Sequence, residues 1–390
     1  MDWMGLAVEI ATTLLTLGGL AYMLLAMAGA RQFARDRRRQ SVAETTGFAP
    51  DVTILKPVKG VDARMYAGLA SHCRQQYAGH FEIVFGVGGV DDPAVGEIER
   101  LRAEFPDCDL RLVVCPQRLG ASGKVSNLVQ MLAEAKYGQL LINDSDIRVS
   151  PHYLTRVMNG FASAQVGMVT ALYLGQTDAA PSIWSRLEAL GISTDFMPGV
   201  LTARRLEGGV RFGLGSTLAI SRAALEAAGG LVSLVDSLAD DYELGARIAQ
   251  AGFRVELCDE VVETAIPAYN LRDFCQHQLR WARTTRDSRR WGYLGLGITY
   301  AIPWAAVNCV ASGLATWSFG LLGLAVLVRV AVALSVGLAV LGDEQVLRDL
   351  WLLPIRDCFG LGFWAWSYAS DTIIWRGERF HLRKGQLTRT

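Results

Sequence analysis

Several features that define common protein classes are missing from this sequence. No charge of either sign is in excess, because the 390 residues include 38 Lys and Arg and 38 Asp and Glu. A nucleic-acid-binding protein usually carries a basic surface, so we expect no nucleic-acid partner. The seven cysteines are scattered, odd in number and contain no CxxC pair. This pattern favours a reducing compartment over a disulfide framework or a zinc site.

The glycine motifs of two nucleotide-binding folds are also incomplete. In the segment FEIVFGVGGVDDP, Asp91 stands where a GxGxxG dinucleotide fingerprint needs its last glycine. In the segment GASGKVS, Lys124 lacks both the spacing and the adjacent Ser or Thr of a Walker A loop. A nicotinamide oxidoreductase is therefore disfavoured. No internal repeat or low-complexity tract is present.

Long hydrophobic runs, by contrast, are prominent. Hydrophobic residues make up 51% of the chain, and the mean hydropathy is +0.24. Residues 6–30 carry one charge, Glu9, and are long enough to cross a bilayer. Their length and acidic N-terminal flank argue against a cleaved signal peptide. Five arginines follow in residues 31–39, which predicts that this side faces the cytoplasm.

The central part of the chain has the composition of a soluble α/β domain. Between Asp51 and about Asp259, short apolar runs such as VTILK, FEIVFGV and QLLIN alternate with helix-like segments. This rhythm predicts βαβ units with a mainly parallel sheet. In such sheets, ligands bind beyond the carboxyl ends of the strands.

A second apolar region occupies residues 292–342, which is long enough for two spans. Arg329 within it must face protein or reach the membrane surface. Residues 350–375 form a third, Trp-rich candidate, in which Arg356 and Asp357 could pair internally. The predicted domains are an anchor (1–30), a basic linker (31–50), a catalytic domain (51–290), a membrane region (291–375) and a basic cytoplasmic tail (376–390).

Acidic pairs follow two of the predicted strands. Asp144 and Asp146 lie two residues apart after LLIN, so their side chains point to the same side. They could cap the next helix or hold Mg²⁺ or Mn²⁺ together with substrate phosphates. Asp91 and Asp92 precede Pro93, which favours a helix start, although an aspartate here could also accept hydrogen bonds from a base or ribose.

Three further segments allow both a structural and a functional interpretation. Lys124 precedes an amphipathic helix and could bind an anion there or remain in solvent. Asp240 and Asp241 begin another helical stretch, as capping residues or as a catalytic base. The segment HQLRW, residues 277–281, is basic and aromatic and is typical of a membrane-surface helix.

Together these segments resemble the membrane-bound family 2/21 glycosyltransferases, especially the ceramide glucosyltransferases and their bacterial relatives. The similar motifs, in chain order, are ILKPVKGVD, DDPA, GxxxKVSNL, DSDIRV, DDY, RW and WRGERFHLR. The resemblance implies a GT-A fold, a nucleotide-sugar donor, and transfer to a lipid hydroxyl at the cytoplasmic face. A processive polysaccharide synthase would use the same residues but needs more membrane spans.

The resemblance also implies a role for each candidate residue. Asp91 and Asp92 would contact the uridine, Asp144 and Asp146 would bind the metal and the diphosphate, and Asp241 would be the general base. Lys124 and Arg280 would stabilise the departing UDP. The acceptor and diphosphate region would include His277, Gln278, Arg280 and Trp281. A single base without a carboxylate nucleophile implies inversion at the anomeric carbon.

Two departures leave the acceptor open. The family's QxxRW signature has His277 in its first position here, and residues 193–198 read STDFMP where the ceramide enzymes have a His-Pro pair. The segments HQLRWARTTR, DSDIRV and LADDYELG are more similar to the bacterial hopanoid-associated glycosyltransferases. We therefore expect UDP-glucose or UDP-N-acetylglucosamine as donor and ceramide or a hopanoid as acceptor, in a bacterial inner membrane.

Overall fold

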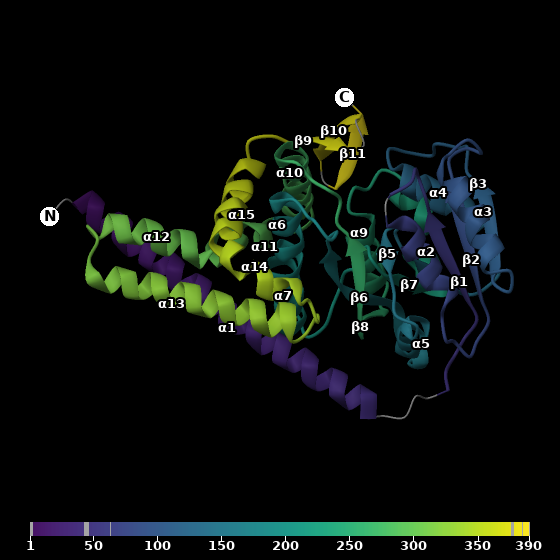
Figure 1. Ribbon diagram of the computed structural model, residues 1–390, viewed down its shortest axis with the longest axis horizontal. Helices are drawn as coiled ribbons and strands as arrows, with labels where there is room; N and C mark the ends of the chain where they lie inside the picture. The colour runs from purple at the N-terminus through teal and green to yellow at the C-terminus, as the bar shows by residue number, and fades with distance from the viewer. Residues whose placement is uncertain (1–2, 43–46, 63, 376–377, 384, 390) are drawn as a thin grey trace. The chain divides into compact units, whose positions relative to one another are not determined.

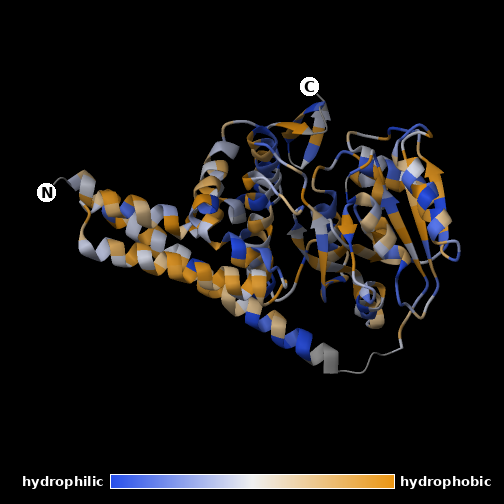
Figure 2. Cartoon of the chain, viewed as in Figure 1, coloured by the Kyte–Doolittle hydropathy of each residue, from blue (hydrophilic) through white to orange (hydrophobic). Residues whose placement is uncertain are grey.

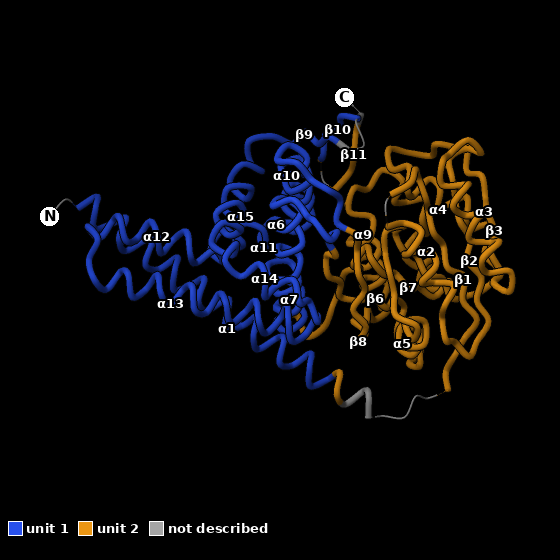
Figure 3. The backbone as a smooth tube through the Cα atoms, in the orientation of Figure 1, with its two compact units in different colours: residues 1–36, 177–206, 266–382 blue, residues 37–176, 207–265, 383–390 orange. Residues whose placement is uncertain are grey.

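A computed structural model describes residues 3–42, 47–62, 64–375, 378–383 and 385–389. The chain forms two compact units, each assembled from separate parts of the sequence (Figure 3). Unit 1 comprises residues 1–36, 177–206 and 266–382, and unit 2 comprises residues 37–176, 207–265 and 383–390. The side chain of Arg39 and residues 376, 377 and 384, which belong to the two predicted basic segments, lie outside the described part.

Unit 2 is built on an eight-stranded sheet with the order β3-β2-β1-β4-β7-β6-β8-β5 (Figure 1). Strands β3, β2, β1 and β4 are parallel neighbours, and β6 is parallel to β8. Strand β7 runs antiparallel to β4 and β6, and β5 runs antiparallel to β8. The strands are β1 (Val52–Pro57), β2 (Phe81–Val87), β3 (Asp109–Val114), β4 (Gln139–Ile142), β5 (Ile147–Arg148), β6 (Val166–Gln176), β7 (Leu218–Ser221) and β8 (Arg254–Ala265).

Helices connect these strands, and the apolar strand residues explain the packing. Ile54, Leu55 and Phe85 are fully buried, as expected for parallel strands covered on both faces. At Gly86 on β2, a Cβ atom would lie 2.2 Å from the sulfur of Met131, so only glycine lets the helix that carries Met131 approach this strand. The unit 2 helices are α2 (Met65–Cys73), α3 (Ala94–Glu104), α4 (Gly123–Leu132), α5 (Tyr153–Asn159), α8 (Arg222–Ala227) and α9 (Asp240–Gln250), and its last strand is β11 (Gln386–Arg389). The predicted α/β class with a mainly parallel sheet is confirmed.

Unit 1 is mostly helical. A small antiparallel pair, β9 (Thr372–Trp375) and β10 (Glu378–Arg383), follows its last helix. Its helices are α1 (Trp3–Val42), α6 (Ile183–Gly191), α7 (Met197–Leu206), α10 (Leu271–Ser288), α11 (Arg290–Thr299), α12 (Ala301–Ala311), α13 (Thr316–Val332), α14 (Gln345–Asp349) and α15 (Leu353–Ser367), with π-helical turns at Ile192–Phe196 and Ala333–Leu338.

Within the described part of the chain, two helical segments are long and apolar enough to cross a membrane: Trp3–Arg38 and Thr316–Leu338. The pair α11 and α12 passes the same test together, with a 54° bend between them, which allows up to three spans. Figure 2 shows these helices as mostly hydrophobic, in contrast to the polar C-terminal end of α1. The Asn308 side chain on α12 donates hydrogen bonds to the Glu9 carbonyl (3.0 Å) and the Thr13 hydroxyl (2.8 Å) on α1, a polar contact of the kind that joins helices in lipid.

Candidate active site

The predicted acidic loop follows β4 in unit 2, and buried polar side chains hold its backbone in place. The Asn143 amide donates to the Tyr153 hydroxyl (2.9 Å) and to the Ser216 carbonyl (2.6 Å). The fully buried Lys56 donates from Nζ to the Asp144 carbonyl at 3.1 Å. Burial lowers the pKa of Lys56 to about 7, against the opposing effect of Asp146 and Asp144. The carboxylates of Asp144 and Asp146 therefore extend from a turn whose backbone is fixed by hydrogen bonds.

Lys124 joins two of the acidic segments that the sequence separates by almost a hundred residues. Its ammonium Nζ lies 2.8 Å from Asp144 Oδ1 and 3.4 Å from Asp240 Oδ2. Burial lowers the pKa of Lys124, but Asp144 and Asp240 outweigh it and raise the pKa above its ordinary value. Lys124 therefore stays a cation at the edge of the sheet, where it can also contact an anionic ligand.

Close backbone contacts explain why these segments meet. The Ser122 side chain caps α4 by accepting a hydrogen bond from the Val125 amide. The Ser122 amide donates to the Val235 carbonyl at 2.7 Å, and a Cβ atom at Gly120 would lie 2.7 Å from Val235. Gly120 thus lets the loop before α4 lie against the segment that leads into α9 and its aspartates.

Asp241 lies in the first turn of α9 and faces the same region. Its Oδ1 accepts a hydrogen bond from the Tyr242 amide at 2.8 Å. A Cβ atom on Gly215 would lie 2.9 Å from Asp241 Oδ2 and 3.8 Å from Asp144 Oδ2. The absence of a side chain at Gly215 therefore leaves the space beside both carboxylates open. Burial and the charge of Asp240, opposed by Lys124, raise the pKa of Asp241 to about 6. Such a carboxylate is ionised at neutral pH and more basic than an exposed one.

The donor set suits a hard divalent cation that shares its coordination with a ligand. Asp146 Oδ2 accepts a hydrogen bond from the Thr264 hydroxyl at 2.6 Å, and burial and the nearby Asp144 raise the pKa of Asp146. A cation would relieve this repulsion. Carboxylate oxygens are ligands for Mg²⁺ or Mn²⁺. Among the residues that the structure describes, no group of three His, Cys, Asp or Glu could hold a metal alone. The residues fit an ion completed by diphosphate oxygens.

Asp91 and Asp92 lie beyond the end of β2, at the same sheet edge as Asp144, because β2 and β4 are both parallel to β1. Asp92 Oδ1 accepts hydrogen bonds from the Gly60 amide (2.9 Å) and the Ala94 amide (3.0 Å). The Asp92 carboxylate thus stabilises the start of α3 and fastens the turn after β1. Asp91 is exposed. The structure shows the capping interaction, and the contact with uridine stays a prediction.

The predicted acceptor residues lie in unit 1, on α10, and a buried carboxylate organises two of them. Glu188 on α6 lies 3.0 Å from His277 Nδ1 and accepts a hydrogen bond from the Gln278 amide at 2.7 Å. Burial raises the pKa of Glu188, but the opposing effect of His277 and Gln278 is larger, so the pKa lies below its usual value. The Trp281 ring centroid lies 5.3 Å from that of His277. Arg280 precedes Trp281 on the same helix.

Lys56 and Glu188 were missed by reasoning from the sequence. The signal for Lys56 was a charged residue inside the apolar strand VTILKP, a position that needs a buried partner. Glu188 gave no comparable signal, because a single glutamate is ordinary in an amphipathic helix such as α6.

Comparisons with known proteins agree with this geometry. The sequence profile described as Glycosyl transferase family 21 matches residues 11–388. Ceramide glucosyltransferase 3 from Caenorhabditis elegans is 23% identical over 277 residues, which cover 70% of this chain and 59% of the relative. An N-acetylglucosaminyltransferase from Sinorhizobium fredii is 26% identical over 261 residues, which cover 62% of this chain and 59% of that protein. Each match spans less than two thirds of the relative's length.

Among solved structures, the mannosyltransferase PcManGT from Pyrobaculum calidifontis in complex with GDP-Man and Mn²⁺ superposes with a TM-score of 0.55. The match has 19% identity and covers 93% of this chain and 98% of the mannosyltransferase. At this identity the likeness concerns the fold, and it confirms the predicted GT-A architecture. The profile match extends over nearly the whole chain, and the protein therefore belongs to glycosyl transferase family 21.

Proposed function

We propose that the protein transfers a hexose or N-acetylhexosamine from a UDP-sugar to a hydroxyl group of a membrane lipid. The observation that carries the proposal is the gathering of Asp144, Asp240 and the half-buried Asp241 around Lys124 at the carboxyl edge of the sheet. This arrangement provides a base and a cation for a diphosphate leaving group. The apolar helices of unit 1 support a lipid acceptor, and the basic end of α1 supports catalysis at the cytoplasmic face.

Asp241 acts as the general base in this proposal. Its carboxylate takes the proton of the lipid hydroxyl while the hydroxyl oxygen forms a bond to the anomeric carbon. The bond between the anomeric carbon and the phosphate oxygen breaks, and UDP departs with the electron pair. Since one displacement occurs without a carboxylate nucleophile, the anomeric configuration is inverted.

Charge on the leaving diphosphate is the second problem that the site must solve. The Lys124 ammonium is fixed by Asp144 and Asp240 and can donate to a phosphate oxygen without reorganisation. Asp144 and Asp146 would hold Mg²⁺ or Mn²⁺, which neutralises phosphate charge when bound. The related fold of a mannosyltransferase in complex with Mn²⁺ supports this assignment.

The remaining predicted residues complete the proposal. Asp91 and Asp92 contact the uridine, and His277, Gln278, Arg280 and Trp281 serve the acceptor and the diphosphate. Similarity to ceramide glucosyltransferases and to an N-acetylglucosaminyltransferase supports glucose and N-acetylglucosamine as the donor sugars to test.

The test is a transfer assay with the full chain in lipid nanodiscs. UDP-glucose or UDP-N-acetylglucosamine is offered against ceramide or bacteriohopanetetrol, and products are identified by mass spectrometry and anomeric NMR. We expect one sugar per lipid with inverted configuration. Retention would contradict the single displacement, polymer would favour a processive synthase, and the absence of product with every pair would contradict lipid glycosylation.

A further inference from the structure

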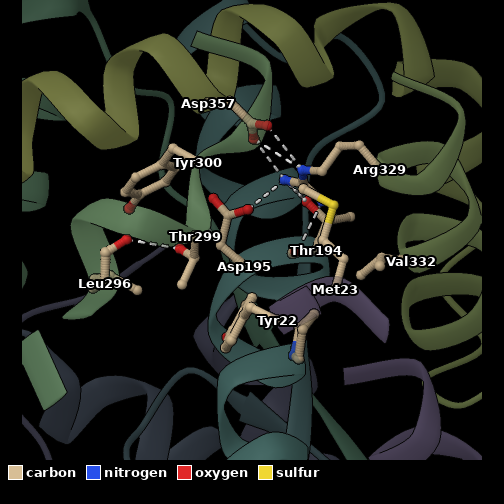
Figure 4. A pocket seen from close by; sticks show the side chains of 11 residues that line it. Tyr22, Met23, Thr194, Asp195, Leu296, Thr299, Tyr300, Arg329, Val332 and Asp357 are labelled. Carbon is tan, nitrogen blue, oxygen red and sulfur yellow. Dashed lines mark hydrogen bonds and ion pairs between the residues drawn. The ribbon is translucent and has the colours of Figure 1, made fainter. Parts of the chain in front are cut away.

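Unit 1 contains a small pocket among its helices, lined by both apolar and polar side chains (Figure 4). Its volume of about 30 Å³ accommodates one water-sized polar group, such as a hydroxyl, but not a sugar. The lining residues come from α1, the α6–α7 region, α11, α13 and α15, and include Asp195, Tyr300, Arg329, Val332 and Asp357.

The backbone around this pocket is irregular on three sides. The π-helical turn Ile192–Phe196 carries Asp195, and a second π-helical turn, Ala333–Leu338, begins next to the lining residue Val332. Tyr300 lies at the break between α11 and α12, where the chain bends by 54°. Such turns occur frequently at functional sites. Within a membrane, non-helical backbone is tolerated where it is enclosed by protein or lines a polar cavity.

A balanced set of charges lies beside the pocket. Arg329 Nη2 pairs with Asp357 Oδ1 at 2.8 Å and also with Asp195. Arg356 Nε lies 3.2 Å from Asp195 Oδ2. The side chains of Arg329, Arg356 and Asp357 are at most 8% exposed, whereas that of Asp195 is 19% exposed. Asp195 is therefore the member of this network that is open to a ligand, and two arginines already neutralise two aspartates, so the ligand should be uncharged.

The same network continues to α10. Arg356 Nη2 donates to Oε1 of the Gln278 side chain at 3.1 Å, and Gln278 Nε2 donates to Glu188, which also contacts His277. A ligand that changes the position of Asp195 thus acts on the helix that carries the predicted acceptor residues, through hydrogen bonds within one unit.

We propose that this pocket binds a hydroxyl group of the acceptor lipid other than the hydroxyl that reacts. The Asp195 carboxylate accepts the hydrogen bond, and the Tyr300 hydroxyl is the second partner. The inference rests on the proposed function, since it names a specificity subsite for the lipid. It predicts selection of lipids that carry at least two polar groups near one end, which both ceramide and bacteriohopanetetrol do.

The experiment compares Asp195→Asn and Tyr300→Phe with a matched control, Tyr293→Phe. Tyr293 is a buried tyrosine on α11 whose hydroxyl donates to Ser367 at 2.9 Å, and it does not line the pocket. Full-length protein in phosphatidylcholine nanodiscs is titrated with ceramide, with 3-deoxyceramide and with bacteriohopanetetrol, and bound lipid is counted by native mass spectrometry. UDP-sugar binding is measured in parallel.

We expect Asp195→Asn to weaken ceramide or bacteriohopanetetrol binding by about tenfold and Tyr300→Phe by about threefold. Tyr293→Phe should bind like the wild type, 3-deoxyceramide should bind less tightly than ceramide, and UDP-sugar binding should not change. Tyr300→Phe keeps every charge, so it tests the pocket even if Asp195→Asn fails to fold. Wild-type affinity for both lipids in Tyr300→Phe and Asp195→Asn would overturn the subsite.

The two proposals fail in different ways. If the wild type binds lipid in this variant-sensitive manner but transfers no sugar, the proposed function is wrong and the subsite stands. If transfer occurs and the KM for lipid is unchanged in the pocket variants, the subsite is wrong and the proposed function stands.

Discussion

A cluster of charged side chains in unit 2 and one in unit 1 differ in charge balance and exposure. In unit 2, four carboxylates (Asp144, Asp146, Asp240 and Asp241) surround the amino groups of Lys56 and Lys124, and the Asp144 side chain is 41% exposed. In unit 1, Arg329 and Arg356 balance Asp195 and Asp357, and Asp357 is 1% exposed.

This difference separates a cluster with excess negative charge from one whose charges are balanced and mostly buried. An open cluster with excess negative charge gains from a cation, and removal of one carboxylate relieves repulsion. A closed and balanced cluster leaves an unpaired buried charge when one member is removed, at a cost of about 3–5 kcal/mol. Substitutions in the unit 2 cluster should therefore reduce activity with little loss of stability, and removal of Arg329 from the unit 1 cluster should do the reverse.

The strongest test of this contrast replaces both Asp144 and Asp146 with Asn. Transfer should be abolished together with its dependence on Mg²⁺ or Mn²⁺, because the oxygens that bind the ion are lost. The thermal unfolding midpoint should stay the same or rise. Mn²⁺ binding is measured by electron paramagnetic resonance, independently of turnover.

Asp109→Asn is the matched control, since Asp109 pairs with Lys136 at the start of β3 and contributes nothing to the acidic cluster. It should keep wild-type Mn²⁺ binding. Full activity of the wild type in EDTA would remove the metal from the proposal.

A slightly smaller loss is expected for Asp241→Asn. Transfer should fall by about 10²–10⁴-fold, the range for loss of a general base, while UDP-sugar binding remains close to that of the wild type. Glu243→Gln applies the same chemical change in the same turn of α9, at a residue that pairs with Arg247, and should be nearly silent. Equal turnover in the two variants would make Asp241 a helix cap.

The sequence predicts much of unit 2 because its signals are local. Apolar strands alternate with amphipathic helices, and strand polarity brings the aspartates that follow β2 and β4 to one edge. Lys124 and Asp240 had local signals too, but their ion pair did not, since it depends on the fit of Gly120 against Val235.

Unit 1 was harder to predict because its partners are distant in sequence. The adjacent residues Arg356 and Asp357 suggested an internal pair, but Asp357 pairs with Arg329 and Arg356 pairs with Asp195. Successive residues on a helix point about 100° apart, so neighbours in sequence seldom face each other. Arg329 faces protein, one of the two options that its position in an apolar run allowed. Nothing in the composition of residues 177–206 indicated that they fold with the membrane helices.

The third prediction concerns the closed cluster. Arg329→Met should lower the free energy of unfolding by about 3–5 kcal/mol, because Asp357 and Asp195 lose their shared partner in a buried site. UDP-sugar binding by protein that remains folded should be unchanged. Thermal unfolding and nucleotide binding are measured on the same sample. Arg348→Met removes a half-exposed arginine and leaves the buried Asp349 its second partner, Arg186, so it should cost about 1 kcal/mol or less. Similar losses for both variants would refute the contrast between open and closed clusters.

The smallest effect is a pH dependence. With the pKa of Asp241 near 6, the fraction of active carboxylate falls as the pH drops through 6, so kcat at pH 5 should be about tenfold below its plateau. Asp240 and Asp144 raise this pKa and Lys124 lowers it, so all three groups help to set the pH at which kcat begins to fall on the acidic limb of the profile. The measurement is kcat at saturating donor, lipid and Mn²⁺ from pH 5 to 8, with Asp241→Asn as the control that should lack the limb. A flat wild-type profile would exclude Asp241 as the group that accepts the proton.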